Sequence, residues 1–331
     1  MTFDDVIGSA WTGARWSPFA ETVASCYPNQ VPWFHTTAIS LAPGSGNVPP
    51  RTTTLVRPQK YDILIFGASA QSGDANLNNL QSLLLNVTHM ETGIPWVAPN
   101  NIGYSPVLSF AGLNFNNPMP IQRLPEVFYF PKLTTLKLDW TVAQSGSIID
   151  TITTNFTLLG VQLIHPDPNY SAPDIIIMPT GEHVGLRSRM PWFASVPFGA
   201  RPASSAPRLL YDWALAPQDQ RVQFLPPVDC DVEIHDCSAN FTANAQLFAG
   251  NTALLSCKLS EMRAKDDWTP DLAPVTAVFG NQQQIYPNMP FTRPHVVRKG
   301  YRTAVVMQNN DPTNQVNRGI ITFRGVRRCE Y

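Results

Sequence analysis

Self-similarity along the chain constrains this 331-residue sequence more strongly than any single motif. Four pairs of segments recur in the same order, at offsets between 165 and 170 residues. The pairs are Asp62 with Asp231, Phe110 with Phe279, Met119-Pro120-x-x-Arg123 with Met289-Pro290-x-x-Arg293, and Thr157-x-x-Gly160-Val161 with Thr322-x-x-Gly325-Val326. Because the offset drifts by only five residues, the pattern predicts an internal duplication over residues 56–165 and 222–331.

Each copy carries the alternation of apolar and polar residues that is typical of a strand with one buried face. The apolar members are Leu136, Leu138, Trp140 and Val142 in the first copy, and Val228, Cys230, Val232 and Ile234 in the second. Prolines separate such runs, which favours many short strands joined by turns. We therefore expect an all-β protein made of two tandem β-sandwiches, each an eight-stranded jelly roll, that is, a double jelly roll.

The repeat divides the chain into four parts. Residues 1–55 form an N-terminal arm, 56–165 the first jelly roll, 166–221 a Pro-rich ordered connector and 222–331 the second jelly roll. Ser17-Pro18 predicts a short helix in the arm, and Ser205-Ala206-Pro207 predicts another in the connector. The arm is too apolar to remain free in water, so we expect it to pack on its own subunit or on a neighbour.

The composition excludes several classes of protein. A disordered chain needs low hydrophobicity and high net charge, whereas this chain is 44% hydrophobic with a net charge of −1. Only 14% of residues are charged, so the surface must be rich in neutral amides and hydroxyls, which suits a protein packed against copies of itself. The chain shows neither an apolar stretch of about 20 residues nor a basic N-terminal leader, so we expect cytoplasmic synthesis.

Five scattered cysteines argue against a disulfide framework. The strand alternation turns Cys230 inward as a small buried thiol, and turns His235 and Cys237 outward. A straight strand cannot bring these side chains to one zinc ion. We therefore expect no disulfide, no metal site and no cofactor.

No catalytic motif is present: the sequence lacks a nucleophile elbow, a His-Glu-x-x-His motif, a phosphate loop and a dinucleotide fingerprint. We therefore expect no enzyme activity. In the repeated Met-Pro-x-x-Arg motif, Met119 and Met289 fill the sandwich end, Pro120 and Pro290 fix a turn, and Arg123 and Arg293 tie a loop to carbonyls or a neighbour. Gly160 and Gly325 mark a bulge or a close backbone approach. A duplicated catalytic site is the alternative for these residues.

Charged residues gather in the second copy. Asp229, Asp231 and Glu233 form an acidic row, which we expect to be solvated or to lie between subunits. Many arginines follow, including Arg298, Arg324, Arg327 and Arg328. Their planar side chains favour salt bridges between subunits, and anionic lipid or nucleic acid is the alternative partner.

Two adjacent sandwich copies, a low-charge surface and an arm, without a catalytic motif, resemble the double jelly-roll major capsid proteins of tailless icosahedral phages with an internal membrane. The resemblance is of architecture over about 220 residues and rests on the repeat. It implies a structural virion protein that forms a homotrimer with a pseudo-hexameric outline. It also implies contacts with neighbouring capsid or vertex proteins and peripheral contact with the lipid membrane, without sequence-specific nucleic-acid binding.

Jelly rolls also occur in other classes of protein, so two alternatives stay open. One is a glycan-binding module that recognises a receptor, and the other is a two-sandwich hydrolase. Either should bring aromatic and acidic residues together at one loop end of one copy. Trp96 and Trp268, at an offset of 172, are instead expected to be paired core positions.

Overall fold

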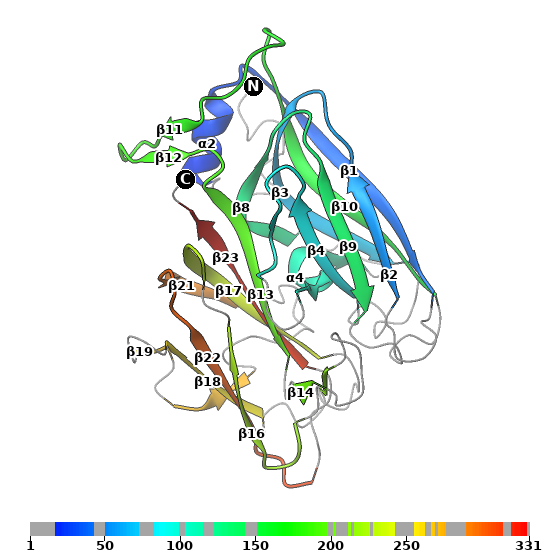
Figure 1. Ribbon diagram of the computed structural model, residues 1–331, viewed down its shortest axis with the longest axis vertical. Helices are drawn as coiled ribbons and strands as arrows, with labels where there is room; N and C mark the ends of the chain where they lie inside the picture. The colour runs from blue at the N-terminus through cyan, green and yellow to red at the C-terminus, as the bar shows by residue number, and fades with distance from the viewer. Residues whose placement is uncertain are drawn as a thin grey trace.

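The computed structural model describes most of the strand-forming chain. The described residues are 17–42, 50–72, 83–98, 103–114, 122–142, 151–197, 201–202, 211–212, 215–225, 228–241, 255–261, 266–268, 271–275, 289–313 and 319–329. Two β-sandwiches follow one another along the long axis of the molecule (Figure 1).

The first sandwich is a jelly roll of two facing sheets. One sheet has the order β1 (Asn29–Leu41), β10 (Ile152–Ile164), β3 (Asp62–Ser72), with β8 (Gln122–Phe130) and β7 (Gly112–Asn114) on β3. The other has the order β2 (Arg51–Val56), β9 (Leu136–Val142), β4 (Leu83–His89), with β5 (Ile94–Pro95) and β6 (Ser105–Pro106) on β4, followed by α4 (Val107–Phe110). All pairings are antiparallel except that of β3 with β7, and the first strand pairs with the last.

The second sandwich repeats this strand order. One sheet runs β13 (Arg189–Pro197), β23 (Gly319–Arg328), β17 (Asp231–Phe241), β21 (Met289–Val297). The other runs β16 (Gln220–Phe224), β22 (Thr303–Asn309), β18 (Leu255–Glu261), with β19 (Asp266–Asp267) and β20 (Ala273–Pro274) on β18. The predicted fold class, two tandem jelly rolls, is therefore confirmed.

The predicted boundaries need correction, because each sandwich begins earlier than the repeat suggested. β1 and all of β2 except Val56 lie within residues 1–55, yet they pair with β10 and β9 of the first sandwich. β13 and the first two residues of β16 lie within residues 166–221, yet they pair with β23 and β22 of the second. A jelly roll needs its first strand to close the sheet beside its last, so these strands belong to the sandwiches rather than to an arm or a connector.

A short helix, α2 (Pro18–Ser25), begins where the Ser17-Pro18 signal predicts it. The Ser17 side chain accepts a hydrogen bond from the Ala20 backbone N–H at 3.2 Å, and Pro18 opens the first turn. The apolar face of α2, with Phe19 fully buried, packs on the outer face of β3, β8 and β10 together with the hairpin β11 (Ile175–Ile177) and β12 (His183–Gly185). This part of the arm is therefore bound to its own sandwich.

The second expected helix starts in residues 203–210, which lie outside the described part of the chain. The residues on either side of that segment form a short two-stranded pair, β14 (Arg201–Pro202) with β15 (Tyr211–Asp212).

Both sandwiches carry a bulge at the same place in the pairing of their central strands. The register shifts between Leu159 and Gly160 in the first and between Ile234 and Asp236 in the second, where Gly325 pairs with Ile234. A Cβ atom at Gly160 would lie 2.6 Å from the Leu64 carbonyl oxygen, and one at Gly325 would collide with the carbonyl oxygen of Glu233. Each glycine therefore allows a close backbone approach beside a bulge.

The two Met-Pro-x-x-Arg segments do not occupy equivalent positions. In the first copy, Arg123 on β8 pairs with Gly67 on β3. In the second copy, Asp236 on β17 is equivalent to Gly67, and it pairs with Pro290. The motif is therefore shifted by three residues between the copies, and Arg293 lies further along its strand, exposed to solvent. Met119 and Pro120 lie outside the described residues.

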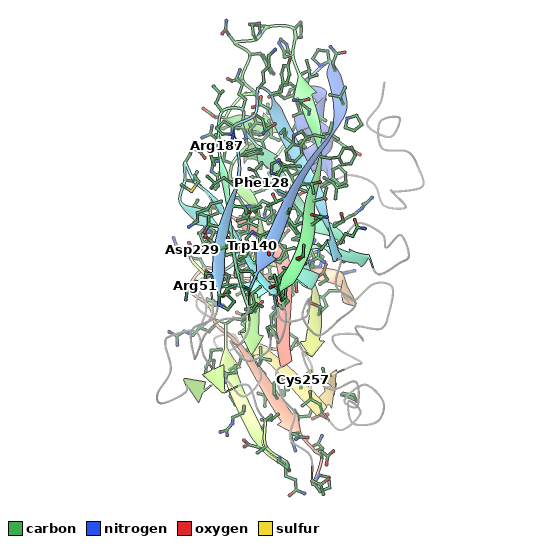
Figure 2. The ribbon with its side chains drawn as sticks, turned by 90° about the vertical axis from the view of Figure 1, so that its right-hand side faces the viewer. Arg51, Phe128, Trp140, Arg187, Asp229 and Cys257 are labelled. Carbon is green, nitrogen blue, oxygen red and sulfur yellow. A yellow bond between two sulfur atoms is a disulfide. The ribbon has the colours of Figure 1, made fainter. Side chains whose placement is uncertain are left out.

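Each sandwich encloses its own hydrophobic core. Phe128 and Trp140 lie inside the upper sandwich of Figure 2, and Cys257 lies inside the lower one. Trp96 and Trp268 occupy paired positions, as expected; Trp96 is fully buried, and Trp268 is partly buried against the second core. The backbone N–H of Trp96 donates to the Val87 carbonyl at 2.7 Å, and the backbone N–H of Trp268 donates to the Leu259 carbonyl at 2.9 Å. Both residues therefore anchor the same turn in their copies.

Candidate functional site

The two sandwiches meet at a junction that is made by both backbone and side chains. Strands β13 and β23 of the second sandwich pack against β6, β8 and the segment after β5 of the first (Figure 1). The Phe193 N–H donates to the Trp96 carbonyl at 2.9 Å, and the Ala98 N–H donates to the Phe193 carbonyl at 2.7 Å. A parallel bridge between Val97 and Phe193 results. The two jelly rolls are thereby joined by main-chain hydrogen bonds as well as by side chains.

The side chains at this junction are buried. The Phe193 side chain is 0% exposed, and its ring centroid lies 4.1 Å from that of Phe110 in the first sandwich. Beside it, the Ser195 hydroxyl lies 2.7 Å from the Ser105 hydroxyl and 3.0 Å from that of Thr322. The junction therefore excludes water and satisfies its hydroxyl groups internally.

Arg324 places a buried cation at the same junction. Its guanidinium donates to the carbonyl of Arg123, lies 3.4 Å from Asp236 Oδ1 and stacks over the Phe193 ring at 6.0 Å. Burial raises the pKa of Asp236 and lowers the pKa of Arg324. A buried charge with fixed partners penalises alternative packings, so Arg324 helps to specify how the two sandwiches are joined.

Glu126 on β8 ties three elements together near the top of the junction. The Ser17 hydroxyl donates to Glu126 Oε1 at 2.6 Å, and Arg189 at the start of β13 lies 2.9 Å from Glu126 Oε2. The cap of α2, the first sandwich and the second sandwich thus share one buried carboxylate. The sequence offered no signal for Glu126, because its partners are 63 or more residues away.

The repeated aspartates perform the same task in both copies. Asp62 Oδ1 accepts from the Lys132 backbone N–H at 2.7 Å, and Asp231 Oδ1 accepts from the Lys299 N–H at 2.8 Å. Asp62 therefore holds the turn after β8, and Asp231 holds the turn after β21. In the first copy the Tyr27 hydroxyl also donates to Asp62, at 2.6 Å.

The acidic row and the basic residues of the second copy pair with each other within the chain. Arg298 lies 2.7 Å from Asp231, Arg328 lies 2.8 Å from Glu233, and Arg327 contacts Asp229. These arginines thus have carboxylate partners within their own chain, whereas the sequence predicted partners in other subunits. Antiparallel pairing of β17 with β23 brings the acidic strand beside the basic one, which the sequence separation concealed.

The expectation for the cysteines is also wrong. Cys230 is partly exposed and forms a disulfide with Cys329, 99 residues away, because the neighbouring Asp231 and Arg328 pair across β17 and β23. Cys237 points inward and is fully buried, since the bulge between Ile234 and Asp236 reverses the alternation. Cys257 is a buried thiol nearby, and burial raises its pKa to about 12.

The outer face of β1 carries an uncovered aromatic side chain. The Phe34 side chain is 58% exposed, and Pro32 on the same side of the strand is also exposed. Next to them, the hydroxyls of Thr36 and Thr157 lie 3.0 Å apart in solvent. β1 runs along the outer, right-hand edge of the upper sandwich in Figure 1, away from the junction. The sequence held a signal for this surface that the repeat search missed, namely Pro-Trp-Phe at 32–34 and again at 191–193.

Two pockets lie near the β11–β12 hairpin. One, of about 740 Å³, is lined by polar residues beside the disulfide, including His183, Arg189, Asp231 and Lys299. The other, of about 430 Å³, includes His89, Phe128, Tyr129, Asp174 and Arg187. Asp174 is the one carboxylate among the residues that line the second pocket, whereas Glu182, Asp229 and Asp231 line the first.

Metal and membrane features can be stated for the described residues alone. Within those ranges, no three His, Cys, Asp or Glu side chains cluster as metal ligands would. None of the helices in the described part of the chain has the length and hydrophobicity needed to span a bilayer.

Comparison with known proteins gives no match to a protein-family model and none to a curated protein. Among solved structures, a chain of the Sulfolobus Turreted Icosahedral Virus is 12% identical with a TM-score of 0.24, covering 87% of this chain and 59% of its own length. A chain of the Sputnik virophage is 10% identical with a TM-score of 0.24, covering 89% of this chain and 85% of that one. The CUB1-EGF-CUB2 domain of human MASP-1/3 is 10% identical with a TM-score of 0.19, covering 88% and 99%. The chain spans about 59% of the length of the first virus chain.

Proposed function

We propose that this protein is a structural capsid subunit, a major capsid protein that forms a homotrimer with a pseudo-hexameric outline and tiles an icosahedral shell. The junction between the two jelly rolls carries the proposal. Two domains of one strand order, joined through Phe193 and Arg324 in a buried contact, behave as one rigid building block. Three such blocks supply six similar jelly rolls to one ring.

The surface chemistry supports assembly rather than catalysis. With 14% charged residues and a net charge of −1, the free chain has little electrostatic repulsion between copies. The arginines in the second copy are largely paired with its own carboxylates, which reduces their availability for nucleic acid. A protein of this kind works through its contacts with other chains.

The remaining partners belong to the same proposal. In a virion, the trimer would contact neighbouring capsid or vertex proteins, and its inner end would face the internal membrane peripherally. These partners rest on the resemblance to double jelly-roll capsid proteins. No sequence-specific nucleic-acid contact is part of the proposal.

Light scattering of the purified full chain, followed by electron microscopy, tests the proposal. We expect a particle of three times 36.6 kDa in solution, and hexagonal tiles or closed shells at higher concentration. A monomer over the whole concentration range contradicts a capsid role. A monomer that binds an immobilised glycan would favour the receptor-recognition alternative, and glycan or amide hydrolysis would favour the hydrolase.

A further inference from the structure

Phe34 and Phe193 occupy the same position in the two jelly rolls. Each follows a tryptophan that pairs with the bulge glycine of its own copy: Trp33 pairs with Gly160, and Trp192 with Gly325. Both tryptophans point into their own cores. Because side chains alternate along a strand, each phenylalanine must point out of its own sandwich.

The surroundings of these two equivalent faces differ. Pro191, Phe193 and Ser195 on β13 are all buried, whereas the equivalent Pro32, Phe34 and Thr36 on β1 are all exposed. The hydroxyl pair is repeated as well, with a separation of 3.0 Å between Ser195 and Thr322 and between Thr36 and Thr157. In the first copy this pair is open to solvent. The chain therefore displays one covered and one uncovered version of the same face.

The second copy's face is covered by β8 and by the β5–β6 end of the first sandwich, where Ser105 contacts Ser195. The equivalent end of the second sandwich is β19–β20, in which Ala273 pairs with Cys257 as Ser105 pairs with Leu85. The end of the first sandwich is buried. In the second, Leu272 is 39% exposed and Pro274 is also exposed.

We propose that the β1–β10 face of one chain is covered by the β19–β20 end of a second copy of this chain, which repeats between subunits the contact made within each subunit. The inference rests on the proposed function and names the surfaces through which the trimer forms. The contact is head-to-tail, because its two sides differ, and such a contact closes into a ring when the rotation per subunit permits.

A second copy is favoured over another occupant because the chain itself contains a complementary partner for this face. The same Pro-Trp-Phe strand already fits the equivalent end of a jelly roll in the intramolecular junction. Helix α2 covers Val161 and Leu163 on the outward side of β10, and the uncovered residues are Pro32, Phe34 and Thr36 on β1.

Engineered cross-linking tests this geometry directly. Thr36 is equivalent to Ser195, and Ala273 to Ser105, whose hydroxyls are 2.7 Å apart in the junction. The double variant Thr36→Cys/Ala273→Cys, made with Cys26→Ser to remove a partly exposed thiol, should form disulfides between chains and run as a covalent trimer without reductant. A mixture of the two single variants should give a linked dimer, and neither single variant alone should do so.

Phe34→Asp supplies the second measurement, with Phe224→Asp as the matched control. Phe224 is also an exposed phenylalanine on the edge strand of a sheet, at 45% exposure. Loss of an interface anchor costs at least about 2 kcal/mol, or roughly 30-fold in affinity. We expect Phe34→Asp to raise the trimer dissociation constant by that factor or more, and the control to leave it nearly unchanged.

The outcomes separate this inference from the proposed function. If the double-cysteine variant formed trimers without disulfides between chains, and Phe34→Asp left trimer formation unchanged, the assigned surfaces would be overturned and the capsid role would stay intact. A wild-type chain that stays monomeric would overturn both. Binding of that monomer to lipid vesicles or to a glycan through Phe34 would identify a different occupant of the face.

Discussion

The first and second jelly rolls share strand order and bulge position, but their outer faces beside the repeated aspartates differ. Leu64 in the first copy is fully buried beneath α2, and the residue at the equivalent place in the second copy is Glu233, which forms an ion pair with Arg328. Leu163 is similarly buried where the second copy has Arg328. One backbone framework thus accepts an apolar or an ionic outer face, and the presence of a covering helix decides which residues are stable there.

Exchanging the residues at the equivalent positions Leu64 and Glu233 should have the largest effect on stability. Leu64→Glu buries an unpaired carboxylate under Phe19 and the rest of α2, so we expect it to lower the free energy of unfolding by more than about 4 kcal/mol. The reciprocal Glu233→Leu removes one partly exposed ion pair and should change stability by about 1 kcal/mol or less. Urea unfolding followed by tryptophan fluorescence measures both. Equal losses in the two variants would contradict the role assigned to α2.

The disulfide distinguishes the copies further, since Tyr61 and Ile164 occupy the places of Cys230 and Cys329 in the first. Replacing both cysteines by serine should lower stability by about 2–4 kcal/mol, because the cross-link restricts the unfolded chain. Hydrogen exchange should accelerate in β17 and β23 and stay unchanged in β3 and β10. Acceleration in both sandwiches would mean that they unfold as one cooperative unit.

Replacing the repeated aspartates, Asp62 and Asp231, should give a smaller difference in stability between the two copies. Asp62→Ala leaves the Tyr27 hydroxyl and the Lys132 N–H without their buried acceptor, so we expect a loss of about 1.5–3 kcal/mol. Asp231 is half-buried, and its backbone donor can turn to water, so Asp231→Ala should cost less than about 1 kcal/mol. Thermal or urea unfolding of the two variants gives the comparison, and a larger loss for Asp231 would reverse it.

The smallest expected effect is a pH dependence that belongs to the second copy. The Lys299 N–H and then Arg298 lower the pKa of Asp231, and hydrogen bonding from His235 together with the charge of Arg328 lowers that of Glu233. A carboxylate with a depressed folded-state pKa stabilises the protein above its unfolded value, near 4, and loses that contribution as the pH falls through the folded value. Relative to Asp231→Asn/Glu233→Gln, wild-type stability should therefore hold above about pH 5 and converge below about pH 3. A difference that grows on acidification would contradict this sign.

Local pattern was enough to predict much of the fold. Period-two alternation correctly placed Leu136, Leu138 and Trp140 in the core, and the Ser17-Pro18 signal located α2. The repeat predicted two copies of one sandwich. These features depend on residues close together in sequence, or on similarity between segments, and both can be read without knowing what packs against what.

Register and pairing could not be read in this way. One extra residue at the bulge before Asp236 turned Cys237 inward, and antiparallel pairing brought Cys329 to Cys230 from 99 residues away. Strand pairing sums many weak contacts over the whole sheet, so a short motif such as Met-Pro-x-x-Arg does not reveal a three-residue shift.

The Pro-Trp-Phe strands show the limit most directly. The sequence by itself determined that each tryptophan and the phenylalanine after it point to opposite faces of their strand, because alternation is a property of the single strand. Only the tertiary structure decided that Phe193 is buried at the junction while Phe34 is exposed. Burial of an outward-facing side chain depends on which other surface reaches it, and in this chain the first jelly roll reaches the second on one side only.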